Sequence, residues 1–268
     1  MIYNPYPQVD LPFGKDNLYF KILFDAIYKV DESFVNYTIN VQGDTKMKSD
    51  DLQEHVERVF AYELYRQWAN LLEENGIRNL VLNGEISKGI IDDQNRLNPN
   101  EKECGTRSIF PDLVLHASQE NDNNQLMVCE IKREKDFDDK DFLHDLYKLY
   151  KYINKEDKGF VWAKPFIYGI FILVGSSVSL ENLTKLQHDS HTNFLDDNKT
   201  WDDFQTHHAD CSSHIVCITY NGTVLEYNTL DNMYPELKQN KNESNIDNIN
   251  YNSQCPRGER PRTKREEL

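Results

Sequence analysis

Three charged side chains fall in segments that otherwise favour buried β-strands. Asp112 follows Pro111 at the start of the apolar run 109–116, and Glu130 and Lys132 lie in the second run, 126–133. The two runs are rich in β-branched and large apolar residues and are separated by a polar loop of Ser, Gln, Asn and Asp. This pattern predicts a β-hairpin. Since strand side chains alternate between faces, Glu130 and Lys132 must project from the same side.

The register of this hairpin decides which residues face each other. A turn centred on Asn121, the middle of the polar loop, places Asp112 opposite Glu130. Directly opposed residues of an antiparallel pair lie about 5 Å apart. Two carboxylates at that distance repel each other unless one is protonated or a cation lies between them. Carboxylate oxygens suit Mg²⁺ or Mn²⁺, and Lys132 could orient a water or offset charge on a phosphorane-like transition state. The chemistry this predicts is phosphodiester hydrolysis.

The motif Pro111-Asp112, seventeen residues, then Glu130-Ile131-Lys132 resembles the PD-(D/E)xK signature of the restriction-endonuclease-like nucleases. The segments FPDLVLH and LMVCEIKRE are similar to bacterial proteins of that fold. The resemblance implies a core in the order helix, three strands, helix, strand. It also implies that Asp112 and Glu130 bind the metal, with Lys132 as their catalytic partner.

The remaining elements predict the same order. We expect helices over 17–30, 49–75 and 136–153, strands over 78–86 and 165–174, and a hairpin over 214–227 that turns at Asn221-Gly222. The fold class is therefore α/β, a restriction-endonuclease-like core with a mixed central sheet flanked by helices and an added C-terminal β-hairpin. We divide the chain into an N-terminal accessory segment (1–46), the nuclease domain (47–235) and a disordered polar tail (236–268).

Other charged residues are weaker candidates for the site. Glu63 falls in the apolar stripe of the 49–75 helix. It either adds a metal ligand, as a residue of the first core helix often does in the family, or pairs with a buried Arg or Lys, or lies at the edge of a poorly packed stripe. Glu57 points elsewhere on the helical wheel and is expected to be solvated. Lys148 either reaches a substrate phosphate or pairs with Asp145 three residues before it.

Two further features have alternative interpretations. Arg107, just before the motif, either contacts a phosphate or is solvated. A group of histidines and cysteines could bind zinc, although its spacing fits no zinc module that we can name. These residues are His207, His208, Cys211, His214 and Cys217.

Composition limits the functional classes. The net charge of −15 disfavours tight binding to nucleic acid that does not depend on sequence, although a local basic groove is compatible with it. Five irregularly spaced cysteines and the absence of a signal peptide or a membrane-spanning run favour a reduced, cytoplasmic setting. We expect a Mg²⁺-dependent nuclease that acts on nucleic acid, DNA rather than RNA, with Mn²⁺ as a substitute and a homodimer as an option. The alternatives are a catalytically inactive protein of this fold that binds nucleic acid or a protein partner, and a purely structural interaction protein.

Overall fold

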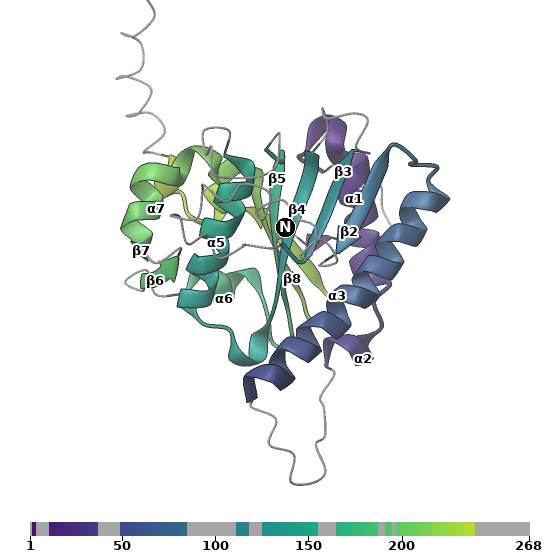
Figure 1. The fold of residues 1–268 in the computed structure, drawn as a ribbon, viewed down its shortest axis with the longest axis horizontal. Helices are drawn as coiled ribbons and strands as arrows, with labels where there is room; N and C mark the ends of the chain where they lie inside the picture. Colours follow the sequence, from purple (N-terminus) through teal and green to yellow (C-terminus); the bar gives the residue numbers. More distant parts are fainter. Residues whose placement is uncertain are drawn as a thin grey trace, which may run out of the picture.

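The fold is built on a mixed β-sheet with helices on both faces, as seen in the computed structural model (Figure 1). The structure describes residues 2–3, 11–36, 49–84, 111–117, 125–154, 165–186, 191–194 and 197–238. Within these ranges, no helix is long and apolar enough to cross a membrane. The mixed α/β class predicted from the sequence is confirmed.

The central sheet has seven strands in the order β1-β9-β8-β5-β4-β3-β2. Strands β4, β5 and β8 are parallel, and every other neighbouring pair is antiparallel. The strands are β1 (Ile2–Tyr3), β2 (Leu80–Gly84), β3 (Leu113–Ala117), β4 (Gln125–Arg133), β5 (Tyr168–Val174), β8 (Ile215–Tyr220) and β9 (Leu225–Thr229). A separate pair is formed by β6 (His191–Phe194) and β7 (Asp197–Thr200).

Helices and short 3-10 turns alternate with these strands. The α-helices are α1 (Asn17–Tyr28), α2 (Glu32–Val35), α3 (Ser49–Glu74), α5 (Asp139–Ile153), α6 (Leu180–Thr184), α7 (Trp201–His208) and α8 (Leu230–Met233). The 3-10 turns are η1 (Gly14–Asp16), η4 (Glu134–Asp136) and η5 (Ala209–His214). The central elements therefore follow one another as α3, β2, β3, β4, α5 and β5, which is the order that the sequence predicts.

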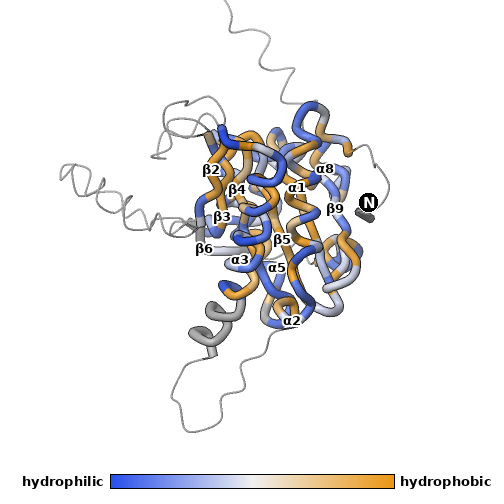
Figure 2. The backbone as a smooth tube through the Cα atoms, turned by 90° about the vertical axis from the view of Figure 1, so that its right-hand side faces the viewer, coloured by the Kyte–Doolittle hydropathy of each residue, from blue (hydrophilic) through white to orange (hydrophobic). Residues whose placement is uncertain are grey.

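The sheet separates two hydrophobic cores, because alternate residues of its strands face opposite sides. In β5, Ile170 and Ile172 pack with α1 and α3, whereas Phe171 and Leu173 pack with α5 and α7. This strand is buried on both faces, as its nearly continuous apolar sequence predicts. Figure 2 shows the apolar segments of the strands gathered in the middle of the molecule.

Helix α1 belongs to the same core as the sheet. Phe20 and Phe24 are fully buried there and pack onto the core. The boundary proposed at residues 46 and 47 lies outside the described residues. At the other end Leu237 is still buried, and residues 239–268 also lie outside the described part.

Candidate functional site

The predicted hairpin is formed by β3 and β4, and its register agrees with the estimate from the sequence. Leu113 pairs with Cys129 and Val114 pairs with Val128, so Asp112, one residue before β3, comes opposite Glu130. The backbone N–H of Asp112 donates to the Cys129 carbonyl at 3.0 Å. The Ile131 N–H donates to Asp112 Oδ2 at 2.6 Å, which ties the carboxylate to the neighbouring strand.

Glu130 and Lys132 extend from the face of β4 that α5 covers. Val128, two residues earlier, packs in the core beneath α5, whereas Cys129 and Ile131 pack in the core beneath α3. Only 1% of Glu130 is exposed. A carboxylate this deeply buried destabilises the fold unless it is paired, protonated or bound to a cation.

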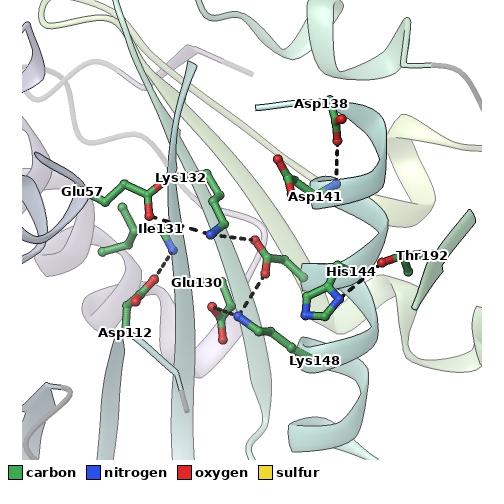
Figure 3. Close-up of polar contacts among 11 residues, drawn as sticks. Glu57, Asp112, Glu130, Ile131, Lys132, Asp138, Asp141, His144, Lys148 and Thr192 are labelled. Atoms are coloured by element: carbon green, nitrogen blue, oxygen red, sulfur yellow. Dashed lines mark hydrogen bonds and ion pairs between the residues drawn. The ribbon is translucent and has the colours of Figure 1, made fainter. Parts of the chain in front are cut away.

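Helix α5 brings two more charges to this face. The helix begins after Asp138, whose carboxylate accepts the backbone N–H groups of Lys140 and Asp141. Further along the helix, Asp145 forms an ion pair with Lys132 of β4, and Lys148 points toward β4 (Figure 3). Lys148 Nζ lies 2.9 Å from Glu130 Oε2 and 3.1 Å from Asp145 Oδ1.

Asp145 contacts both lysines of the site. Its Oδ2 lies 3.9 Å from Lys132 Nζ, while its Oδ1 binds Lys148. Like Glu130, Asp145 is only 1% exposed. It therefore joins the lysine of β4 to the lysine of α5 through one buried carboxylate.

Glu57 reaches the same group of charges from α3. Strand β4 continues for four residues beyond the pairing of Leu113 with Cys129, so its end is not covered by β3. At this end Glu57 Oε2 lies 3.8 Å from Lys132 Nζ, and its side chain is 20% exposed. The expectation that Glu57 is solvated is therefore wrong, because Lys132 lies at the end of β4 beyond its pairing with β3, within reach of α3.

We call these six residues the charge cluster: Glu57, Asp112, Glu130, Lys132, Asp145 and Lys148. It contains four carboxylates and two ammonium groups, so the carboxylates outnumber the cations by two. Among the residues that the structure describes, two buried oxygens, Glu130 Oε1 and Asp145 Oδ2, have no hydrogen-bond donor. The cluster therefore has surplus negative charge and carboxylate oxygens that are not hydrogen-bonded.

The surplus negative charge changes the acidity of the cluster. Burial, reinforced by the neighbouring carboxylates, raises the pKa of Asp112 to about 6, of Glu57 to about 7 and of Glu130 to about 8. Burial lowers the pKa of Lys148, but the adjacent carboxylates outweigh this and hold it well above its ordinary value. The lysines are therefore charged at neutral pH, while part of the carboxylate set is protonated.

A divalent cation would reduce the repulsion between these carboxylates, because it can take the place of the protons that they bind. Within the described ranges, however, no three His, Cys, Asp or Glu side chains are arranged so that they could hold a metal ion. In the charge cluster the ammonium of Lys148 lies between Glu130 and Asp145. The residues suit a cation chemically, and Lys148 holds the position between these two carboxylates.

The other candidates from the sequence lie elsewhere. Glu63 accepts hydrogen bonds from Arg66 Nε and Gln67 Nε2, each at 2.8 Å, and the bond from Arg66 lowers its pKa. The interpretation that it pairs with an arginine is the one observed, although this arginine is exposed. Lys148 makes the predicted pair with Asp145. Arg107 lies outside the described residues.

The histidines and cysteines of the zinc alternative do not gather into a site. His208 packs against Tyr150 with the ring centroids 3.8 Å apart and the planes tilted by 38°, and Cys211 donates to the His208 carbonyl. Cys217 is buried in β8. All five residues are described, and they form no metal-binding group.

Sequence reasoning missed the roles of Glu57 and Asp145 in joining the cluster. Both roles depend on contacts between separate elements of the fold, and helical periodicity does not predict such contacts. One signal was available in the sequence. Asp145 and Lys148 have the i, i+3 spacing of a helical ion pair, and the helix follows a strand that also carries one acidic and one basic residue, Glu130 and Lys132.

Comparison of the chain with protein-family models, curated proteins and solved structures finds no match.

Proposed function

We propose that this protein is a Mg²⁺-dependent nuclease with a PD-(D/E)xK core. The observation that carries the proposal is the β3–β4 register, which sets Asp112 opposite Glu130 with Lys132 on the same face of β4. The element order from α3 to β5 agrees with the core that the sequence motif implies. In this proposal β8 and β9 form a hairpin added to that core.

The cluster residues have distinct roles in this proposal. Asp112 and Glu130 hold the metal, since Glu130 has an unpartnered buried oxygen and both carboxyls bind protons unusually tightly. The backbone carbonyl of Ile131 adds a further ligand. Lys132 orients the attacking water or stabilises charge that develops on the phosphate. Bound Mg²⁺ or Mn²⁺ would polarise the phosphate and make that water a better nucleophile.

Glu57 replaces Glu63 as the carboxylate that α3 contributes. It contacts Lys132, whereas Glu63 is engaged by Arg66 and Gln67. Glu57 is thus placed to hold Lys132 or to add a ligand.

We propose nucleic acid, DNA before RNA, as the substrate of a cytoplasmic enzyme. A homodimer would supply two such sites for cutting both strands of a duplex.

The second candidate is an inactive protein of the same fold that binds nucleic acid or a protein partner. The ion pairs of Lys148 favour it, because they already neutralise part of the carboxylate charge. The net charge of −15 favours it too. Glu130 Oε1 disfavours it, because none of the described residues donates a hydrogen bond to this buried oxygen, and a purely structural ion network has no physical reason to leave it without a donor.

The two candidate functions are distinguished by an assay of nucleic acid cleavage, which only the nuclease should carry out. Wild type, Asp112→Ala and Lys132→Ala are incubated with labelled single- and double-stranded DNA and RNA, in Mg²⁺, Mn²⁺ or EDTA. Glu63→Gln is the matched control, because its carboxylate lies outside the cluster. We expect metal-dependent cleavage by wild type and Glu63→Gln, and none by the other two folded variants. Cleavage at the wild-type rate by Asp112→Ala would refute the assignment.

A further inference from the structure

The position of Lys148 has a consequence for regulation of the site. We propose that Lys148 is an internal competitor of the metal ion, and that Asp145 is a positioning residue that retains the ammonium group when the metal takes Glu130. The inference rests on the proposed function, since it concerns the same cation. It adds a built-in control of metal affinity to that function.

The ammonium group of Lys148 lies between two buried carboxylates. Lys148 Nζ lies 2.9 Å from Glu130 and 3.1 Å from Asp145, and both carboxylates are almost fully buried. Each uses one oxygen for Lys148, and no group in the described part of the chain donates a hydrogen bond to the other oxygen of either carboxylate. The single positive charge of Lys148 is therefore the counter-ion of both Glu130 and Asp145.

A metal ion and the Lys148 ammonium group would compete for Glu130. A divalent cation on Glu130 would lie close to an ammonium that contacts the same carboxylate, and like charges at such short range in a buried site repel strongly. Metal binding therefore requires Lys148 to leave Glu130. The unbranched stem of lysine can make this movement without a shift of the helix.

The displaced ammonium group would stay beside Asp145. Asp145 lies three residues before Lys148 on α5, so their ion pair persists when the contact with Glu130 is broken. Asp145 also lies 3.9 Å from Lys132, which places both ammonium groups beside one carboxylate. In the metal-bound state, Asp145 would hold the displaced ammonium near the site, where it can meet the negative charge of a phosphodiester.

The test measures Mn²⁺ affinity by calorimetry, with the metal alone as the probe and no substrate. Lys148→Met is compared with wild type, with Lys148→Gln as a second neutral replacement and Lys148→Arg as the charge-retaining variant. Lys140→Met is the control, because it removes an exposed charge from the same helix. Melting temperatures in EDTA and in Mn²⁺ show whether each variant is folded.

We expect the neutral Lys148 variants to bind Mn²⁺ about ten- to a hundredfold more tightly than wild type. In wild type the metal must first break the charge-assisted hydrogen bond between Lys148 and Glu130, and a bond of this kind contributes a free energy equivalent to that change in affinity. In EDTA they should melt several degrees lower, because Glu130 loses its counter-ion, and Mn²⁺ should restore the loss. Lys148→Arg and Lys140→Met should keep the wild-type affinity within about threefold. Neutral variants that bind Mn²⁺ no more tightly than wild type overturn the competition.

A double-mutant cycle tests whether Asp145 retains the Lys148 ammonium group. Asp145→Asn should weaken Mn²⁺ binding at least about fivefold in the wild-type background, because Lys148 then has only Glu130 to pair with. It should have little effect in the Lys148→Met background, where there is no ammonium to retain. The same weakening in both backgrounds would make Asp145 a metal ligand and overturn its positioning role.

The outcomes separate this inference from the proposed function. Mn²⁺ binding by wild type with no gain in the Lys148 variants overturns the competition alone. Binding by the Lys148 variants and not by wild type supports the competition in its strongest form. No binding by any variant overturns the proposed function and the competition together.

Discussion

Replacement of Asp112 by Asn should stabilise the metal-free protein at pH 8. The carboxyl has its pKa raised from 3.8 to about 6, chiefly by burial. The folded state therefore binds this proton more tightly than the unfolded state. Protonated Asp112 adds to the free energy of unfolding below pH 3.8, and this contribution is lost as the pH rises through 6. This rise of the pKa corresponds to ~3 kcal/mol. Asn keeps an oxygen for the Ile131 N–H and cannot ionise.

We expect Asp112→Asn to exceed wild type by about 1–3 kcal/mol in the free energy of unfolding at pH 8, and to differ little from it at pH 4. Urea unfolding in EDTA at the two pH values measures this. At pH 8, added Mn²⁺ should stabilise wild type and not the variant, since the stabilising substitution removes a proposed metal ligand. A variant that is equally destabilised at both pH values would refute the reasoning.

Asp203→Asn is the matched control, because its effect should have the opposite sign. Asp203 accepts hydrogen bonds from the hydroxyl and backbone N–H of Thr200 at the start of α7, and the hydroxyl bond lowers its pKa. Its ionised form thus stabilises the fold, and this contribution is present above its ordinary pKa and lost as the pH falls. Asp203→Asn should lower stability at pH 8 and not in acid.

Three further predictions concern single residues. Phe20→Ala should lower the free energy of unfolding by about 3–5 kcal/mol, as measured in urea, because the ring is fully buried between α1 and the sheet; a loss under about 1 kcal/mol would contradict that packing. Glu57→Gln should weaken Mn²⁺ binding in calorimetry, whereas Glu63→Gln should not, and equal effects would contradict the distinction between them. Gly222→Ala should destabilise the protein by about 1 kcal/mol in thermal unfolding, because Gly222 has a φ of 96° and an added Cβ would come within 3.0 Å of the Glu32 side chain.

Local patterns predicted the order of elements from α3 to β5 and the hairpin register correctly for identifiable reasons. The polar loop between β3 and β4 is bounded by two strongly apolar runs, so its midpoint fixed the opposition of Asp112 and Glu130. The pairing has a bulge only near the loop, between Leu115 and His116, and the register is regular where Asp112 lies. The α3 and α5 helices were visible from their periodicity and, for α5, from acidic residues at its start.

The rest of the cluster depends on tertiary structure. On a helical wheel Glu57 lies off the apolar stripe, and only the uncovered end of β4 brings Lys132 within its reach. Glu63 lies on that stripe, yet Arg66 and Gln67, three and four residues later, satisfy it within the helix, and this local pairing could have been read from the sequence. That Asp145 bridges two lysines depends on how α5 lies against β4, which no local pattern specifies.

The most direct test of the account is a calorimetric titration of Mn²⁺ into wild type and Asp112→Asn at pH 8. We predict a saturable site in wild type whose binding releases protons, because the cation replaces those held by carboxyls with raised pKa values. The folded variant should show no such site. Equal Mn²⁺ binding by the two proteins, or none by wild type and by Lys148→Met alike, would contradict the claim that the charge cluster is a metal centre.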